Sequence, residues 1–274
     1  MSTTADSMEK EILRSIHVNI PFTLLYDSYL PRFIQERLNP EVGIDAHALD
    51  HYSASEFRAV GETLRRNGLE VTLHCPFLDL SPGSLDPAVR EVTRKRLEQT
   101  LDLLPFFEPR AVVCHAGYDE RRYGFFKEKW IAFSLETWSW MAPRVRYEGS
   151  KLMLENVYEG DPRDLLDLFQ ALSGLDVGFC LDTGHMWAFG RKPLEEWLGV
   201  LGTHLQHLHL HDNDGGSDEH LALGRGTIEF RPLFQFLKHL KGTRPLVTLE
   251  PHREPDLSVS LEYLKQHWPW KGGA

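Results

Sequence analysis

Short apolar runs alternate along the chain with longer stretches that have the periodicity of helices. Apolar runs of this length are typical of strands buried on both faces of a parallel sheet, and the stretches between them predict the helices that cover it. We therefore expect repeated βα units. The expected strands cover residues 15–20, 41–46, 71–76, 111–117, 151–157, 177–185, 205–213 and 245–252.

Helices are expected between these strands, and several have recognisable ends. Asp86 precedes Pro87 and Asp161 precedes Pro162, the order of a capping residue and a proline in the first helical turn. Gly68 follows the second helix, where a C-cap glycine is common. The expected helices cover residues 28–38, 54–66, 87–104, 125–147, 162–172, 193–201, 230–240 and 256–267.

Eight strand and helix pairs in about 250 residues predict a (β/α)8 TIM barrel of the α/β class. No linker rich in glycine, proline or serine divides the chain, so we expect one domain over residues 1–274, with residues 1–12 as a flexible N-terminal segment. A doubly wound open sheet is the alternative arrangement of the same units.

Composition places the chain among globular proteins, since 42% of its residues are hydrophobic and 26% are charged. The longest apolar runs have about five to seven residues, well short of the roughly 18 that cross a bilayer. The first residues lack the apolar core of a secretory signal, and the three cysteines form no CxxC motif. These features predict a soluble cytoplasmic protein.

The chain carries 40 acidic and 30 basic residues, for a formal net charge of −10, and it has no long block of Lys or Arg. Proteins that bind nucleic acid avidly usually concentrate positive charge. DNA and membranes are therefore not expected as partners. A small-molecule substrate, either a phosphoester or a sugar, is expected, and the sequence leaves the oligomeric state open.

Imidazole and carboxylate side chains stand where the expected strands end. The active site of a (β/α)8 barrel lies at the carboxyl ends of its strands. Side chains of these types that converge there from different strands are suited to a divalent metal ion. In chain order, the polar residues at the strand ends are Asn19, Asp45, His74, His115, Glu155, Asp182, His185, His209, His211 and Glu250.

The seventh strand alternates histidine with leucine, so His207, His209 and His211 share one face. We interpret His209 as a metal ligand and His207 as a buried histidine with a partner. His211 is expected to contact a ligand or the substrate. The glycine-containing loop that follows presents Asp218 and His220, which in this context extend the ligand set.

A set of motifs from the third to the eighth strand resembles the xylose isomerase-like TIM barrel superfamily, and within it the AP endonuclease family 2 group that includes endonuclease IV. The motifs read LHCPF, CHAG, LEN, LDTGH, HLHLHDN, DEH and LEP. The resemblance implies up to three zinc ions. The implied ligand sets are His74, His115 and Glu155 for the first ion, Glu155, Asp182, His209 and Glu250 for the second, and His185, Asp218 and His220 for the third.

Such a cluster suits phosphoester hydrolysis, because metal ions activate water and neutralise charge on phosphoryl oxygens. Glu155, Glu250 and His211 are the candidate catalytic residues. Zinc is implied by the resemblance, whereas the ligand types alone would also accept Mn, Fe or Co.

The superfamily offers alternative activities. A sugar or sugar-phosphate isomerase or epimerase needs only the second ligand set, and would use its two glutamates as acid and base. An endonuclease for abasic-site DNA is a further alternative, although loops expected to enter the minor groove are not recognisable. The stretches HVNIP, RLNPEVGIDA, HCPFLDLSPGS and HAGYD also resemble cobamide-remodelling phosphodiesterases, which cleave the nucleotide loop of corrinoids.

Residues near the strand ends are expected to contact the substrate. Arginines there are candidates to clamp a phosphate, with pairing to a rim carboxylate as the alternative. Polar residues have the alternative of capping loops, and aromatic residues that of anchoring loops on the barrel rim. The expected substrate contacts are Asn19, Asp45, Tyr118, Trp187, Arg225 and Arg253.

Overall fold

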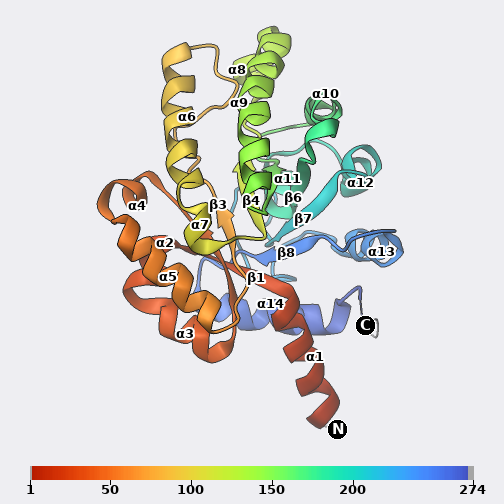
Figure 1. Cartoon of the computed structure of the whole chain (residues 1–274). Helices are drawn as coiled ribbons and strands as arrows, with labels where there is room; N and C mark the ends of the chain where they lie inside the picture. Colours follow the sequence, from red (N-terminus) through yellow and green to blue (C-terminus); the bar gives the residue numbers. More distant parts are fainter. Residues whose placement is uncertain (1, 271–274) are drawn as a thin grey trace.

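The computed structural model describes residues 2–270, and its strands form one closed parallel barrel (Figure 1). Each strand pairs with its neighbours in chain order, and β1 closes the barrel against β8. The strands are β1 Ile16–Pro21, β2 Asn39–Gly43, β3 Thr72–His74, β4 Ala111–His115, β5 Lys151–Glu155, β6 Gly178–Asp182, β7 Leu205–Leu210 and β8 Leu246–Leu249. This confirms the (β/α)8 TIM barrel and excludes the open doubly wound sheet.

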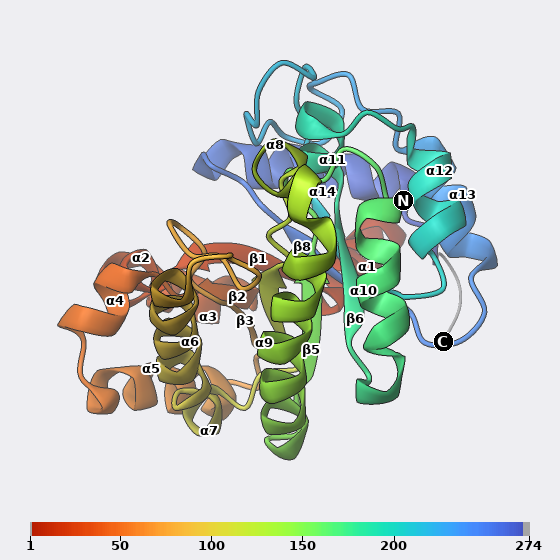
Figure 2. The same ribbon diagram turned by 90° about the horizontal axis from the view of Figure 1, so that it is seen from above.

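Helices surround the barrel and connect its strands (Figures 1 and 2). The α-helices are α1 Ser2–Ser15, α2 Phe22–Leu24, α3 Leu30–Glu36, α4 Ala46–His51, α5 Ala54–Arg66, α6 Pro87–Leu101, α7 Leu104–Phe107, α8 Glu120–Tyr123, α9 Lys127–Tyr147, α10 Arg163–Ala171, α11 Thr183–Phe189, α12 Leu194–Leu201, α13 Arg231–His239 and α14 Glu254–His267. A π-helix, η1 Leu25–Tyr29, and two 3-10 turns, η2 Gly124–Phe126 and η3 Ser173–Leu175, complete the set.

The strand starts agree with the sequence analysis, but several strand ends do not. The expected strand 177–185 is wrong over its last three residues, because β6 ends at Asp182 and α11 begins at Thr183. The Asp182 carboxylate accepts a hydrogen bond of 2.7 Å from the backbone N–H of His185 and so caps this helix. Short helices of this kind carry too little periodic signal to be recognised before the structure.

Helix α1 occupies much of the segment that we expected to be flexible. Ile12 is fully buried, and Glu9 forms an ion pair of 2.7 Å with Lys265 of α14. The apolar positions Met8 and Ile12 are one helical turn apart and both pack on the core. The second half of the segment 1–12 is therefore a docked helix.

The interior of the barrel below the strand ends is polar. Side chains from five different strands, each at most 1% exposed, fill it: His17, Glu41, Thr72, His207 and Thr248. His207 lies 2.9 Å from the hydroxyl of Thr248 through its Nε2, which confirms it as a buried histidine with a partner. Thr72 and Thr248 both donate to the Glu41 carboxylate, whereas the His17 ring has no hydrogen-bond partner among the described residues. Within residues 2–270, no helix has the length and apolar character needed to cross a membrane.

Candidate metal centre

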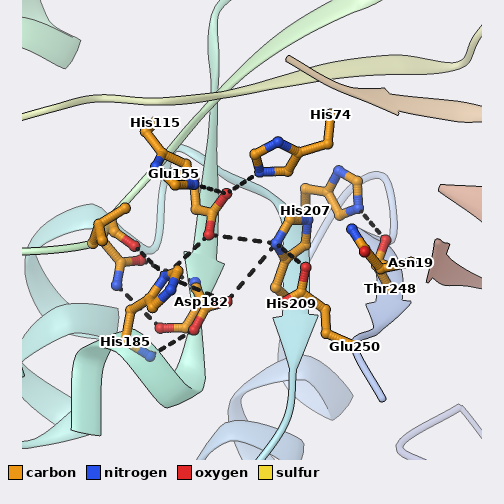
Figure 3. Close-up of polar contacts among 12 residues, drawn as sticks. Asn19, His74, His115, Glu155, Asp182, His185, His207, His209, Thr248 and Glu250 are labelled. Carbon is orange, nitrogen blue, oxygen red and sulfur yellow. Dashed lines mark hydrogen bonds and ion pairs between the residues drawn. The ribbon is translucent and has the colours of Figure 1, made fainter. Parts of the chain in front are cut away.

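The first expected ligand set comes together around Glu155 (Figure 3). His74 from the end of β3 places its Nε2 3.0 Å from Glu155 Oε2, and His115 from the end of β4 places its Nε2 3.6 Å from the same oxygen. Glu155 itself ends β5 and is 1% exposed. Three neighbouring strands thus supply three converging ligands.

The second set shares Glu155 and lies on its other side. The Nδ1 atom of His209 is 3.5 Å from Glu155 Oε1, 3.2 Å from Glu250 Oε1 and 3.8 Å from Asp182 Oδ2. His209 and Asp182 lie at the ends of the paired strands β7 and β6, and Glu250 follows β8 directly. One imidazole nitrogen therefore faces three carboxylates, and Glu155 joins the first set to the second.

The third set is built around Asp218 in the loop after β7. Its Oδ2 atom is 3.2 Å from His185 Nε2 and 3.1 Å from His220 Nε2. His185 lies in the first turn of α11, not at a strand end, so the side chain enters the site from a helix. All nine expected ligands consequently lie in one continuous cluster of three adjoining groups.

His211 lies close enough to His185, Asp218 and His220 to be grouped with them as a potential ligand, but the orientation of its ring sets it apart. Its ring is parallel to that of His220, with centroids 3.8 Å apart and an interplanar angle of 3°. A metal ion lies in the plane of a ligating imidazole at about 2.0–2.1 Å, so one ion cannot lie in both of these stacked planes. The Nε2 atom of His211 instead lies 3.1 Å from Asp182 Oδ1, beside one of the expected ligands.

The absence of a side chain at Gly184 allows the His211 ring to pack against α11. A Cβ atom at this position would lie 1.9 Å from His211 Cε1, so only glycine allows the ring to approach α11. This contact is not encoded in the local sequence, because residues 184 and 211 are brought together by the pairing of β6 with β7.

Replacing Gly184 with alanine is expected to displace His211 and to lower the free energy of unfolding by about 1–3 kcal/mol through overpacking. Gly199→Ala is the matched control, since Gly199 lies in α12 with nothing within 4 Å of the added methyl group. That control is expected to be neutral or stabilising by up to about 1 kcal/mol. Urea unfolding of both variants checks this, and equal stability of the two would contradict the packing argument.

Imidazoles offset part of the negative charge of the buried carboxylates in the cluster. Burial favours the neutral form of Glu155, but His209 and His115 outweigh it and hold the pKa of this carboxyl well below its usual range. Burial likewise works against ionised Asp182, and the nearby His185 and His211 keep its pKa lowered. Among the described residues, the raised pKa values of His185 and His209 keep these imidazoles protonated, so they compensate part of the negative charge that a divalent cation would otherwise neutralise.

The cluster passes a test of fit for divalent ions. Several buried polar atoms inside it have no hydrogen-bond partner among the described residues, including His209 Nδ1, His211 Nδ1 and Asp218 Oδ1. Such orphaned atoms are costly unless something satisfies them, and imidazole and carboxylate donors suit Zn, Mn, Fe or Co. Other ring nitrogens are oriented by backbone carbonyls, as His74 Nδ1 is by Cys75 O at 2.9 Å.

A cavity of about 940 Å³ opens above the cluster. Asn19 and Asp45 line it as expected, although Asp45 also caps α4 by accepting a hydrogen bond from the Ala48 N–H. Its outer walls are apolar and include the partly exposed side chains of Phe77 and Tyr158. A ligand in this cavity would contact the cluster with one end and apolar surface with the other.

Other expected substrate contacts lie elsewhere. Tyr118 is 2% exposed and packs on Trp130, so it anchors the rim from inside. The indole N–H of Trp187 donates to Thr227 Oγ1 at 2.9 Å. Arg253 pairs with Asp256 at 2.9 Å. Arg225 is an exposed loop residue, and neither arginine lines the cavity. Sequence position alone did not reveal where these side chains point.

The structure also adds residues that the sequence analysis missed. Glu41 of β2 is fully buried and its Oε1 lies 3.0 Å from His209 Nε2. His252 stacks on His220 with ring centroids 3.7 Å apart and lines the cavity. A charged residue inside an apolar strand was the available signal for Glu41, since such a side chain needs buried partners.

Glu159 is a further buried carboxylate near the site. Its oxygens accept hydrogen bonds from the backbone N–H groups of Tyr118 at 3.0 Å and Val157 at 2.6 Å, which ties the loop after β4 to the loop after β5. Despite these hydrogen bonds, burial raises the pKa of Glu159 from 4.5 to about 7.

This raised pKa predicts a specific pH dependence. The folded state binds the Glu159 proton more tightly than the unfolded state, so the stabilisation is complete below about pH 4.5 and is lost as the pH rises through about 7. Between these values, wild-type protein should lose about 3 kcal/mol more stability than Glu159→Gln. Urea unfolding across this range measures the difference, and parallel profiles would refute it.

Fold and site together define a (β/α)8 barrel with a candidate metal centre at its strand ends. The sequence profile of the xylose isomerase-like TIM barrel family matches residues 39–267, and the chain belongs to this family. Uncharacterized protein MJ1311 of Methanocaldococcus jannaschii is 29% identical over 226 residues, which cover 79% of this chain and 76% of that protein. A probable endonuclease 4 of Mycobacterium leprae is 26% identical, over 77% of this chain and 85% of its own length.

Solved structures agree with this assignment. The TTHB071 protein from Thermus thermophilus, from a crystal soaked with ZnCl2, superposes with a TM-score of 0.77 and 29% identity, covering 92% of this chain and 97% of that one. A D-tagatose 3-epimerase-like protein superposes over 92% of this chain and 97% of its own, with a TM-score of 0.75 and 23% identity, which shows the shared fold alone.

Proposed function

We propose that this protein is a metal-dependent phosphodiesterase that acts on a small or medium-sized molecule. The observation that carries the proposal is the complete set of nine ligands in three adjoining groups. A single-metal isomerase needs only Glu155, Asp182, His209 and Glu250. His74, His115 and the group around Asp218 have no role in that chemistry, whereas a phosphoester between several cations uses all three groups.

Divalent ions, zinc in the first instance, would supply positive charge for the phosphoryl oxygens and lower the pKa of water to about 7. The chain's own residues have distinct tasks. Glu155 lies between the first and second groups, where its carboxylate can orient a water by accepting its hydrogen bond. His211 contacts the Asp182 carboxylate and holds it in place. Glu250, which follows β8, contributes the last carboxylate of the second group beside His209.

Charge and shape of the cavity favour a single phosphodiester over a DNA duplex. Outside the cluster the charged residues that line it are Asp45, Asp79, Asp119 and Arg122, so the walls carry more negative than positive charge. Together with the net charge of −10, this opposes the binding of a polyanion. The apolar walls suit an organic substituent, and the nucleotide loop of a cobamide is the first natural substrate to test because of the motifs that resemble cobamide-remodelling phosphodiesterases.

The second candidate function is a sugar or sugar-phosphate epimerase or isomerase. Its supporting observation is that Glu155 and Glu250 stand on either side of His209, within 3.5 Å and 3.2 Å of the same nitrogen. Two carboxylates so placed could serve as acid and base at one carbon atom. A substitution in the first group that leaves Glu155 intact distinguishes the two candidate activities, since only the hydrolase would use His74 and His115.

The test compares wild-type protein with His115→Ala after loading with zinc. Hydrolysis is measured with bis(p-nitrophenyl) phosphate, a cobamide and an abasic duplex, and epimerisation as deuterium uptake by ketoses in D2O. We expect phosphodiester cleavage that the substitution reduces by about 10²-fold or more. Deuterium uptake that survives the substitution, without phosphodiester cleavage by the wild type, would support the epimerase instead, and nicking of the abasic duplex would support the endonuclease.

A further inference from the structure

We propose that Glu41 positions His209, so that this histidine presents Nδ1 to the metal centre and keeps its proton on Nε2. The inference rests on the proposed function only in assuming that the cluster binds metal. Glu41 does not line the cavity, and its closest contact with an expected ligand is the 3.0 Å approach to His209, while its other oxygen lies 3.5 Å from His207 Nε2.

The surroundings of Glu41 fix its carboxylate. Its Oε2 accepts hydrogen bonds from Thr72 Oγ1 at 2.9 Å and Thr248 Oγ1 at 3.0 Å, and its Oε1 accepts one from Asn19 Nδ2 at 3.3 Å. Each of these donors comes from a different strand of the barrel. The carboxylate is therefore held rigidly under the site, with Oε1 directed at His209 Nε2.

The two nitrogens of His209 face different environments. Nε2 lies 3.0 Å from Glu41 Oε1 in a close contact that is not aligned as a hydrogen bond, and Nδ1 faces Glu155, Asp182 and Glu250. A carboxylate beside one ring nitrogen favours the tautomer with the proton on that nitrogen, and leaves the lone pair on the other. The lone pair of His209 is thus directed at the second group.

Three of the four other expected imidazole ligands have their Nδ1 atom beside a backbone carbonyl. The Nδ1 atoms of His74, His185 and His220 lie near the backbone carbonyls of Cys75, Asn156 and Glu250, at 2.9, 3.1 and 3.2 Å. Their Nε2 atoms face the cluster, although the Nδ1 atom of His185 also lies 3.1 Å from Glu155 Oε1. His209 has no such backbone partner in the described residues, and a buried side-chain carboxylate takes that place.

The next layer of the barrel supports this arrangement. The Thr248 hydroxyl has one proton, which it donates to Glu41, so it must accept from Nε2 of His207 at 2.9 Å. The direction of each hydrogen bond is thereby set from His207 through Thr248 to Glu41. His207 therefore helps to fix His209, the expected ligand two residues further along β7.

The first experiment measures zinc affinity of Glu41→Gln by competition with a chromophoric chelator. Partners that orient a metal-ligating histidine typically contribute 10–100-fold to affinity, so we expect one class of zinc site to weaken by about that factor. Thr72→Val is the matched control, because it removes one hydrogen bond to Oε2 and leaves the carboxylate beside His209. Circular dichroism verifies that both variants are folded, and unchanged zinc affinity in folded Glu41→Gln would overturn the proposal.

The second experiment does not depend on a folded Glu41 variant. Long-range ¹H–¹⁵N correlation of histidine-labelled wild-type protein reports the tautomer of each ring, with His209→Gln used to assign the His209 signals. We expect the Nε2–H tautomer for His209 in the zinc-loaded protein. A proton on Nδ1 would overturn the proposal. If the wild-type protein bound zinc but cleaved no phosphodiester, the proposed function would fail while the tautomer of His209 in the zinc-loaded protein still tested the role of Glu41.

Discussion

Substitution of Glu155 by glutamine is expected to lower kcat/KM for phosphodiester cleavage by on the order of 10³-fold, the largest effect that we predict for one side chain. Both oxygens of Glu155 are engaged, Oε2 with His74 and His115 and Oε1 with His185 and His209. Glutamine offers one acceptor oxygen and no charge, so it cannot serve both groups.

The same variant should change the metal content. Elemental analysis should show a fall from about three zinc ions per chain to about one, because the group around Asp218 does not include Glu155. Asp79→Asn is the control, since Asp79 lines the cavity outside the cluster and asparagine tolerates its positive φ of 61°. A Glu155→Gln protein with full metal content and wild-type kcat/KM would remove Glu155 from the proposed chemistry.

Zinc should raise the melting temperature of metal-free protein by about 10 °C. Binding at a free concentration 1,000 times the Kd stabilises a protein by about 4 kcal/mol, and 1 kcal/mol shifts Tm by roughly 2–4 °C in a chain of this size. The physical reason is that four carboxylates lie side by side in the cluster, with Glu155, Asp182 and Glu250 buried and Asp218 partly buried. Their mutual repulsion is relieved only in part by the histidines.

Differential scanning calorimetry of chelator-treated protein, with and without zinc, measures this shift. Magnesium is the control cation, because it prefers six oxygen ligands and this site is rich in imidazole. Activity should disappear with the chelator and return with zinc. A melting temperature that is the same in chelator and in zinc would contradict the assignment of the cluster as a metal centre.

The barrel could be predicted because its signal is repeated. Each of eight units carries an apolar run followed by a helical pattern, so an error in one unit does not change the count. The ends of the units were less predictable. The stretch from Thr183 to His185 looks like a continuation of β6, but it forms the first turn of a helix that the Asp182 carboxylate caps by accepting from the His185 N–H. Local capping of this kind depends on one contact rather than on periodicity.

The ligands were predictable for a related reason, since the carboxyl ends of parallel strands meet at one face of the barrel. Their supporting residues were not. Glu41 and His209 are separated by most of the chain and touch only because β1, β2 and β7 surround the same interior. For residues at the barrel rim, the position could be predicted but the direction of the side chain could not. Tyr118 follows β4 as a substrate contact would, but its ring turns inward onto Trp130, a direction that strand position does not encode.

The closure of the barrel by β8 against β1 has a consequence for maturation. The ligands are spread from His74 to Glu250, and Glu250 follows the last strand to pair. During synthesis at about 5–20 residues per second, the second group stays incomplete until that strand has emerged and docked. Contacts between such distant segments form late in folding. Metal ions are therefore expected to bind only after the barrel has closed. A chain stalled before β8 would expose the early ligands but could not retain the full set of metal ions.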